Sequence, residues 1–166
     1  MQDIKIAMIG GGFMGKAHSL AYSAMPMFFW PAPARPVKHV VVDATEDLAR
    51  TAADRYGWNT SSSSWEAVIN DPEVDLVDIA TPNNLHAEIA IAAAEAGKHV
   101  ICEKPLAPTS AEALQMLEAV ERAGVVSAVA FNSWMWNLKL RRLNAALLLQ
   151  LCWRVTSSKL LCPGPL

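Results

Sequence analysis

Three glycines near the start of the chain have a spacing that could bind phosphate: Gly10, Gly12 and Gly15 form a Gly-x-Gly-x-x-Gly pattern. The apolar run 4–9 before them predicts a buried strand, and the segment 14–24 after them predicts a helix. In such a unit the first glycine permits a tight turn, the second admits a pyrophosphate to the backbone, and the third packs helix against strand. The helix N–H groups and dipole then face the phosphates. The pattern predicts a dinucleotide-binding turn, and a glycine turn without a ligand is the alternative.

An acidic side chain, Asp43, stands at the end of the second predicted strand, 37–42. An acid at this place in a dinucleotide-binding fold accepts hydrogen bonds from the adenosine ribose hydroxyls, which favours NAD over NADP. Ala44 and Thr45 come next, so no arginine directly follows to receive a 2′-phosphate, although NADP is not excluded. Capping of the next helix is the alternative role for Asp43.

Two later predicted strands, 75–80 and 99–102, are also followed by polar side chains. Thr81 and Asn83 could meet a nicotinamide ribose, while turn formation and helix capping explain them almost as well. Lys104 is the candidate catalytic residue, because a lysine beside a nicotinamide can hydrogen-bond a substrate hydroxyl and help to move its proton. A solvated surface lysine is its alternative.

The elements that position these residues alternate between strand and helix. The predicted order is β-α-β-α-(β)-α-β-α-β-α-β, and the serine run before the capped helix start at Ser63-Ser64-Trp65-Glu66 reads as a loop. This order predicts a Rossmann-type α/β domain, a doubly wound parallel sheet with helices on both faces. Ligands of such a sheet bind beyond the carboxyl ends of its strands. In the segment 25–36, four prolines around three aromatic residues exclude helix and central strand and predict a loop.

The bulk composition argues against several classes of partner. A formal net charge of −2 over 166 residues gives no electrostatic footprint for nucleic acid. No apolar run reaches the roughly 18 residues of a membrane-spanning helix, and the first residues do not resemble a signal peptide. The three cysteines lack metal-ligand spacing, so no metal site is expected. A cytoplasmic location with reduced thiols is the expectation.

Three motifs resemble those of the Gfo/Idh/MocA family of NAD(P)-dependent sugar and polyol oxidoreductases. They read GGGFMGKAH at 10–18, ATPNxxH at 80–86 and GKHVxxEKPLA at 97–107, and the last is fairly specific to the family. The likeness implies hydride transfer from a carbinol carbon to the nicotinamide of NAD, with Lys104 assisting the proton. The residues implied at the cofactor are Gly10, Gly12, Phe13, Met14, Asp43, Thr81, Asn83, His86, Glu103 and Lys104. For His86, as for His18, a structural role is the alternative because the sequence identifies no partner.

The resemblance covers residues 4–132, which predicts an NAD(P)-binding domain over 1–132 and an atypical tail over 133–166. The tail has five basic residues, no acidic ones, and leucines at helical spacing. Family members continue into a second domain that holds the sugar or polyol substrate, and we expect that domain to be absent here, with an oligomer possible. We expect the tail to be a frame-shifted or otherwise aberrant end of a longer gene, which re-sequencing of the coding DNA would test. The alternative function is a module or fragment that binds NAD(P) without turnover.

Overall fold

The computed structural model describes residues 1–131, in which strands and helices alternate along the chain. The predicted tail and its leucine pattern lie outside the described residues. In chain order the elements are β1 (Gln2–Ile9), α1 (Phe13–Phe28), β2 (Ala34–Val42), α2 (Glu46–Tyr56), β3 (Thr60–Ser62), α3 (Trp65–Ile69), β4 (Leu76–Ile79), the short 3-10 helix η1 (Asn83–Leu85), α4 (His86–Glu95), β5 (His99–Glu103), α5 (Ser110–Ala123) and β6 (Ser127–Ala130).

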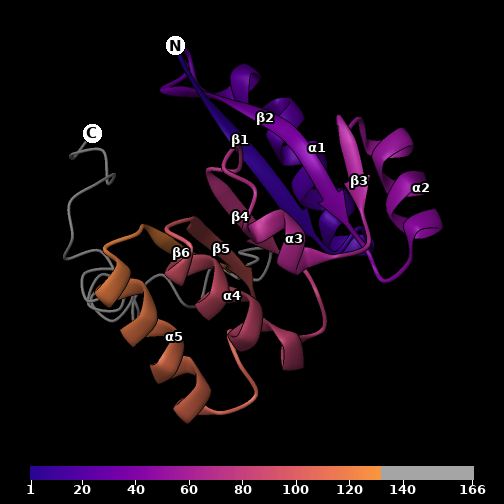
Figure 1. The fold of residues 1–166 in the computed structure, drawn as a ribbon. Helices are drawn as coiled ribbons and strands as arrows, with labels where there is room; N and C mark the ends of the chain where they lie inside the picture. Colours follow the sequence, from indigo (N-terminus) through magenta and orange to yellow (C-terminus); the bar gives the residue numbers. More distant parts are fainter. Residues whose placement is uncertain (132–166) are drawn as a thin grey trace, which may run out of the picture. The chain divides into compact units, whose positions relative to one another are not determined.

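The six strands of the described residues form one sheet in the order β3-β2-β1-β4-β5-β6, and every pair is parallel. The strand order reverses at β1, which pairs with β2 on one side and β4 on the other (Figure 1). This is the doubly wound arrangement that the element order predicts. The Rossmann-type fold is therefore confirmed, and its ligand-binding crevice is expected where β1 and β4 end.

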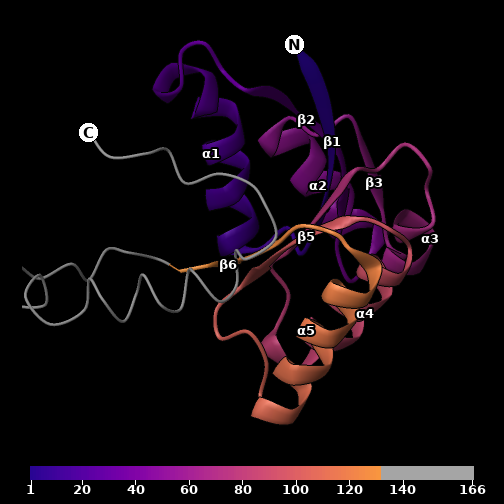
Figure 2. The same cartoon turned by 90° about the vertical axis from the view of Figure 1, so that its left-hand side faces the viewer.

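The alternation of side chains along β1 divides the core into two layers. Ala7 and Ile9 belong to a buried cluster with α3 and α4, whereas Ile6 and Met8 belong to a cluster with the α2 alanines and Trp58. Figure 2 shows α1 and the α4–α5 pair on opposite sides of the sheet. Within residues 1–131, no helix combines the length and apolar composition needed to cross a bilayer.

The prediction for segment 25–36 is wrong at both of its ends. Helix α1 continues through Pro26, which removes only one intrahelical bond near the end, and the Phe29 N–H still donates to the Met25 carbonyl at 3.1 Å. Strand β2 includes Pro36, which pairs with Ile4 of β1. Its missing N–H is tolerated because β3 pairs with β2 only at residues 40–42, so the outer edge at Pro36 is open.

Side-chain caps and glycines define several helix ends. Thr45 accepts the Leu48 N–H at the start of α2, and Gly57 ends that helix with φ 73°. Thr109 and Glu112 form a reciprocal capping box on α5. The serine run departs from the loop prediction, because residues 60–62 form the edge strand β3.

The glycine turn between β1 and α1 brings backbone directly against backbone. A Cβ on Gly15 would lie 2.0 Å from the carbonyl oxygen of Gly10, far inside van der Waals contact. Gly10 itself has φ 106°, and a Cβ there would lie 2.7 Å from the Ala80 carbonyl oxygen. A Cβ on Gly12, in contrast, would meet nothing within 4 Å. The first and third glycines therefore serve packing, and the second borders open space.

We expect Gly15→Ala to lower the free energy of unfolding by more than about 3 kcal/mol, because no nearby flexible side chain can move to relieve the clash. The matched Gly12→Ala change, at an N-cap with φ −69°, should cost less than about 1 kcal/mol. Urea unfolding followed by circular dichroism measures both values. Equal losses for the two variants would contradict the packing role of Gly15.

Candidate functional site

A pocket of about 310 Å³ opens where β1, β2 and β4 end. That volume is at the lower end of the range for small-molecule sites. Four of the predicted cofactor residues line it, namely Gly10, Gly12, Asp43 and Thr81, together with Ile9, Val42, Ala44, Ser63, Trp65, Ala80, Pro82, Leu85 and Ile89. The pocket is thus at the strand reversal, where the fold predicts ligand binding.

Helix α1 starts beside this pocket, which its N-cap Gly12 lines, whereas the predicted cofactor residues Phe13 and Met14 lie outside the lining. Gly12 is the N-cap and has no side chain to accept the N–H groups of the first turn, so those of Phe13 and Met14 lack a side-chain cap. Phe13 is 84% exposed. Free N–H groups at a helix start, next to the open space at Gly12, suit an anionic phosphate.

The Asp43 carboxylate is held in place by backbone N–H groups. Its Oδ2 accepts from Gly11 at 3.1 Å and its Oδ1 accepts from Ala44 at 2.7 Å, which leaves lone pairs on both oxygens for further donors. A Cβ on Gly11 would lie 2.9 Å from that Oδ2 and 2.7 Å from the Ala52 Cβ. Gly11 is therefore needed for this contact. Sequence reasoning treated it as a free position within the glycine pattern.

The Thr81 hydroxyl is the one buried side-chain polar atom without a hydrogen-bond partner among the described residues. Buried polar atoms in native proteins nearly always have a partner. Because Thr81 lines the pocket, a ligand there could supply the missing hydrogen bond. This orphaned hydroxyl, the N–H groups of α1 and the Asp43 carboxylate fit the polar parts of a dinucleotide.

His86 lies outside the pocket lining and has a structural environment. It is 1% exposed, its Nδ1 lies 3.0 Å from the Pro105 carbonyl oxygen, and its Nε2 lies 2.9 Å from the Thr81 carbonyl oxygen. The ring therefore connects the loop after β4 to the loop after β5. Asn83, in η1, is also outside the pocket lining.

Glu103 is the last residue of β5 and Lys104 follows it, and the two side chains differ in exposure. Glu103 is 4% exposed, and its Oε2 accepts the Lys104 N–H at 2.9 Å. Lys104 is exposed. Neither residue lines the pocket, although both lie at the same edge of the sheet. The carboxylate of Glu103 thus faces the protein interior, and the lysine is left facing solvent.

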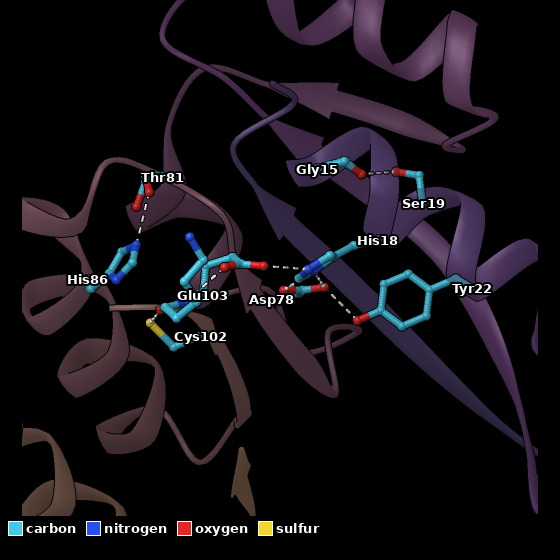
Figure 3. A network of polar contacts seen from close by, with 10 residues as sticks. Gly15, His18, Ser19, Tyr22, Asp78, Thr81, His86, Cys102 and Glu103 are labelled. Carbon is cyan, nitrogen blue, oxygen red and sulfur yellow. Dashed lines mark hydrogen bonds and ion pairs between the residues drawn. The ribbon is translucent and has the colours of Figure 1, made fainter. Parts of the chain in front are cut away.

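Glu103 belongs to a buried polar network with His18, Asp78 and Tyr22, which the sequence did not predict. His18 of α1 lies between Glu103 and Asp78 of β4, and the Tyr22 hydroxyl donates to Asp78 Oδ2 at 2.6 Å (Figure 3). Burial, followed by the charges of Asp78 and Glu103, raises the pKa of the neighbouring Cys102 thiol to about 12. Burial and the adjacent Asp78 likewise raise the pKa of Tyr22. Asp78 is fully buried in the middle of a strand, and only tertiary structure identifies its partners.

Sequence reasoning also missed one wall of the pocket. Ser63, Trp65 and Leu85 line it, from the loop and helix after β3 and from η1. By sequence alone, Trp65 is part of the capped helix start Ser63-Ser64-Trp65-Glu66. The bracketed strand of the predicted order is the sequence feature that could have indicated this wall. A strand parallel to β2 ends at the same edge of the sheet as β2, and the residues after it therefore lie near Asp43.

Comparison with known proteins places these features in a family. A family model described as an oxidoreductase family with an NAD-binding Rossmann fold matches residues 4–131. Levoglucosan dehydrogenase of Pseudarthrobacter phenanthrenivorans is 62% identical over 132 residues, 80% of this chain and 34% of that protein. Myo-inositol 2-dehydrogenase of Thermotoga maritima is 30% identical over 129 residues, 78% of this chain and 36% of that protein. A solved levoglucosan dehydrogenase in complex with NADH and levoglucosan has a TM-score of 0.78 at 61% identity, covering 80% of this chain and 36% of that one.

The chain spans about a third of the length of these relatives, since the matches cover 34% and 36% of them. The matched part contains the glycine turn, Asp43, Thr81 and Lys104, and the family model covers most of the chain. The resemblance seen in the sequence is therefore confirmed: the chain belongs to the Gfo/Idh/MocA oxidoreductase family, with an NAD-binding Rossmann fold over residues 4–131.

Proposed function

We propose that this chain takes part in the NAD-dependent oxidation of a sugar or polyol, and that its described residues hold the coenzyme. The observation that carries the coenzyme site is the orphaned Thr81 hydroxyl in a pocket formed by the glycine turn and Asp43. Relatives named for levoglucosan and myo-inositol support a cyclic sugar or polyol as the substrate class. An anhydrosugar is the first substrate to test.

Different residues of the site would bind different parts of the coenzyme. The uncapped N–H groups of Phe13 and Met14 would hold the pyrophosphate, and the fixed carboxylate of Asp43 would accept the adenosine ribose hydroxyls. Trp65 and Leu85 would line the pocket wall beside them. These roles use charges and donors that the fold has already oriented.

A bound nicotinamide would supply the hydride acceptor. Lys104 would hydrogen-bond the substrate hydroxyl and receive its proton, because an amine at a strand end can act as general base when it is held near the reacting carbon. The lysine backbone is held by Glu103 Oε2, and its side chain is exposed. Asn83 and His86 would contribute through the shape of the adjoining loop.

Replacing the orphaned hydroxyl should separate coenzyme binding from folding. Thr81→Val removes a buried polar atom that has no partner within residues 1–131, so stability without NAD should stay equal or rise. Loss of one hydrogen bond to the coenzyme should weaken NADH binding on the order of fivefold. Fluorescence titration and thermal unfolding measure the two effects. Thr60→Val, whose hydroxyl donates to the His39 carbonyl at 3.0 Å, is the control and should leave NADH affinity unchanged.

The charge at position 43 should set the preference between coenzymes. We expect the native chain to bind NADH at least roughly tenfold more tightly than NADPH, because a 2′-phosphate would lie against a carboxylate. Asp43→Asn removes the charge and should narrow that ratio. Equal affinities of the native chain for the two coenzymes would remove the assignment of Asp43 to the adenosine ribose.

Lys104 should matter for turnover and not for coenzyme binding. Lys104→Met should lower kcat by about 100-fold to 10,000-fold, the range for general acid–base catalysis, with NADH affinity retained. Lys104→Arg keeps the charge and does not give up a proton, so it should be equally inactive. Activity in the arginine variant would show that charge alone is sufficient.

The proposed activity is tested by NADH production with a panel of anhydrosugars and inositols. Turnover of one of them supports the oxidoreductase. Coenzyme binding with no turnover across the panel would instead support the alternative, a chain that binds NAD without catalysis. In that case the coenzyme-binding roles proposed for the pocket residues would still hold, and the catalytic role proposed for Lys104 would be wrong.

A further inference from the structure

His18 occupies a position between two buried carboxylates (Figure 3). Its Nδ1 lies 2.9 Å from Asp78 Oδ2, and its Nε2 lies 3.0 Å from Glu103 Oε1. The side chains of Asp78 and Glu103 are 0% and 5% exposed, and that of His18 is 16% exposed. Carboxylates removed from water to this degree need donors, because burial of an uncompensated charge is costly.

The two carboxylates around His18 determine which protonation state of its imidazole ring satisfies both hydrogen bonds. A neutral imidazole carries one N–H, whereas both ring nitrogens face a carboxylate oxygen, so only the imidazolium donates to both. The hydrogen bond to Asp78 raises the pKa of His18, and Glu103 adds to the increase while burial opposes it. The other titratable groups at this network are the Tyr22 hydroxyl, from α1, and the Cys102 thiol, from β5.

The network continues to the backbone of the candidate catalytic residue. Glu103 Oε1 faces His18, while its Oε2 accepts the Lys104 N–H at 2.9 Å. One carboxylate therefore joins helix α1, which begins at the glycine turn, to the residue that follows β5. Movement of that carboxylate would move the start of the Lys104 loop.

We propose that protonated His18 is a positioning residue, which fixes Glu103 and, through Glu103, the backbone of Lys104 against the helix that starts the coenzyme site. The significance of Lys104 for catalysis rests on the proposed function above. The structural link from His18 to the Lys104 amide does not, because it is made within the free protein.

The direction of the pH dependence follows from the raised pKa. A group whose pKa is higher in the folded state stabilises that state fully below its unfolded value, here the ordinary 6.5, and loses this contribution as pH rises through the folded pKa. Above that pH the neutral ring can donate to only one of Asp78 and Glu103. The positioning of Lys104 should therefore weaken as pH rises through the folded pKa of His18, which lies above the ordinary 6.5.

The first test uses the full chain labelled with ¹⁵N and needs no variant. The ring nitrogens of His18 and the backbone amide of Lys104 are followed by NMR as pH rises. We expect a doubly protonated ring at pH 6.5 and a Lys104 amide shift whose midpoint equals that of His18. A neutral ring at pH 6.5, or a Lys104 amide that does not respond through the His18 transition, would overturn the proposal.

Matched variants extend the test to the coenzyme. His18→Gln should weaken NADH binding on the order of tenfold, as expected for coupled sites, and should abolish the pH response of the Lys104 amide. His39→Gln is the control, since its side chain is also 16% exposed and faces one carboxylate, Asp71, at 3.4 Å. This control variant should change neither the NADH affinity nor the pH response of the Lys104 amide.

Glu103→Gln provides a second variant in case His18→Gln does not fold. It removes one of the two charges at the ring and should lower the pH midpoint of His18, and an unchanged midpoint would contradict the link. The outcomes also separate the two proposals. A chain that titrates as expected but turns over no sugar removes the proposed oxidation only, whereas turnover with an unresponsive Lys104 amide removes the positioning role only.

Discussion

Direct packing of backbone on backbone, where the central strands end, is the constraint on which the rest of the domain depends. The Gly10 N–H donates to the Val42 carbonyl at 2.8 Å, and the Ala80 N–H donates to the Ile9 carbonyl at 2.8 Å, so three strand ends are joined at one point. Side chains at Gly10 or Gly15 would force these segments apart. Of the three glycines of the turn, only Gly12 could carry a Cβ without meeting another atom within 4 Å, and it lines the pocket.

Local chemistry was enough to predict most of the fold. Strand runs, capping boxes and terminal glycines act within a few residues, as the caps at Thr45 and Thr109 and the helix end at Gly57 illustrate. The errors arose where tertiary context decides. Proline is excluded from paired strand edges, but whether the edge at Pro36 is paired depends on the length of β3, which lies more than twenty residues further along the chain.

The site was predictable by residue type and less so by orientation. Asp43 and Thr81 follow strands, and parallel strands end at one edge, so their meeting follows from topology. The orientation of the Glu103 side chain does not follow from topology, because it depends on a contact with His18, which is 85 residues away in sequence. Trp65 likewise reaches the pocket only because β3 adds to the sheet beside β2. Contacts between residues so distant in sequence cannot be inferred from spacing.

The central place of β1 in the sheet has a consequence for synthesis on the ribosome. The strands on either side of it, β2 and β4, are made later. For example, the Lys5 N–H donates to the carboxylate of Asp75, which lies 70 residues further along the chain. At translation rates of about 5 to 20 residues per second, the apolar strand waits roughly 4 to 14 seconds for β4. During that interval its edge can pair with other chains. Strand β1 is thus exposed to aggregation and to chaperones until β2 and β4 have been made and pair with it.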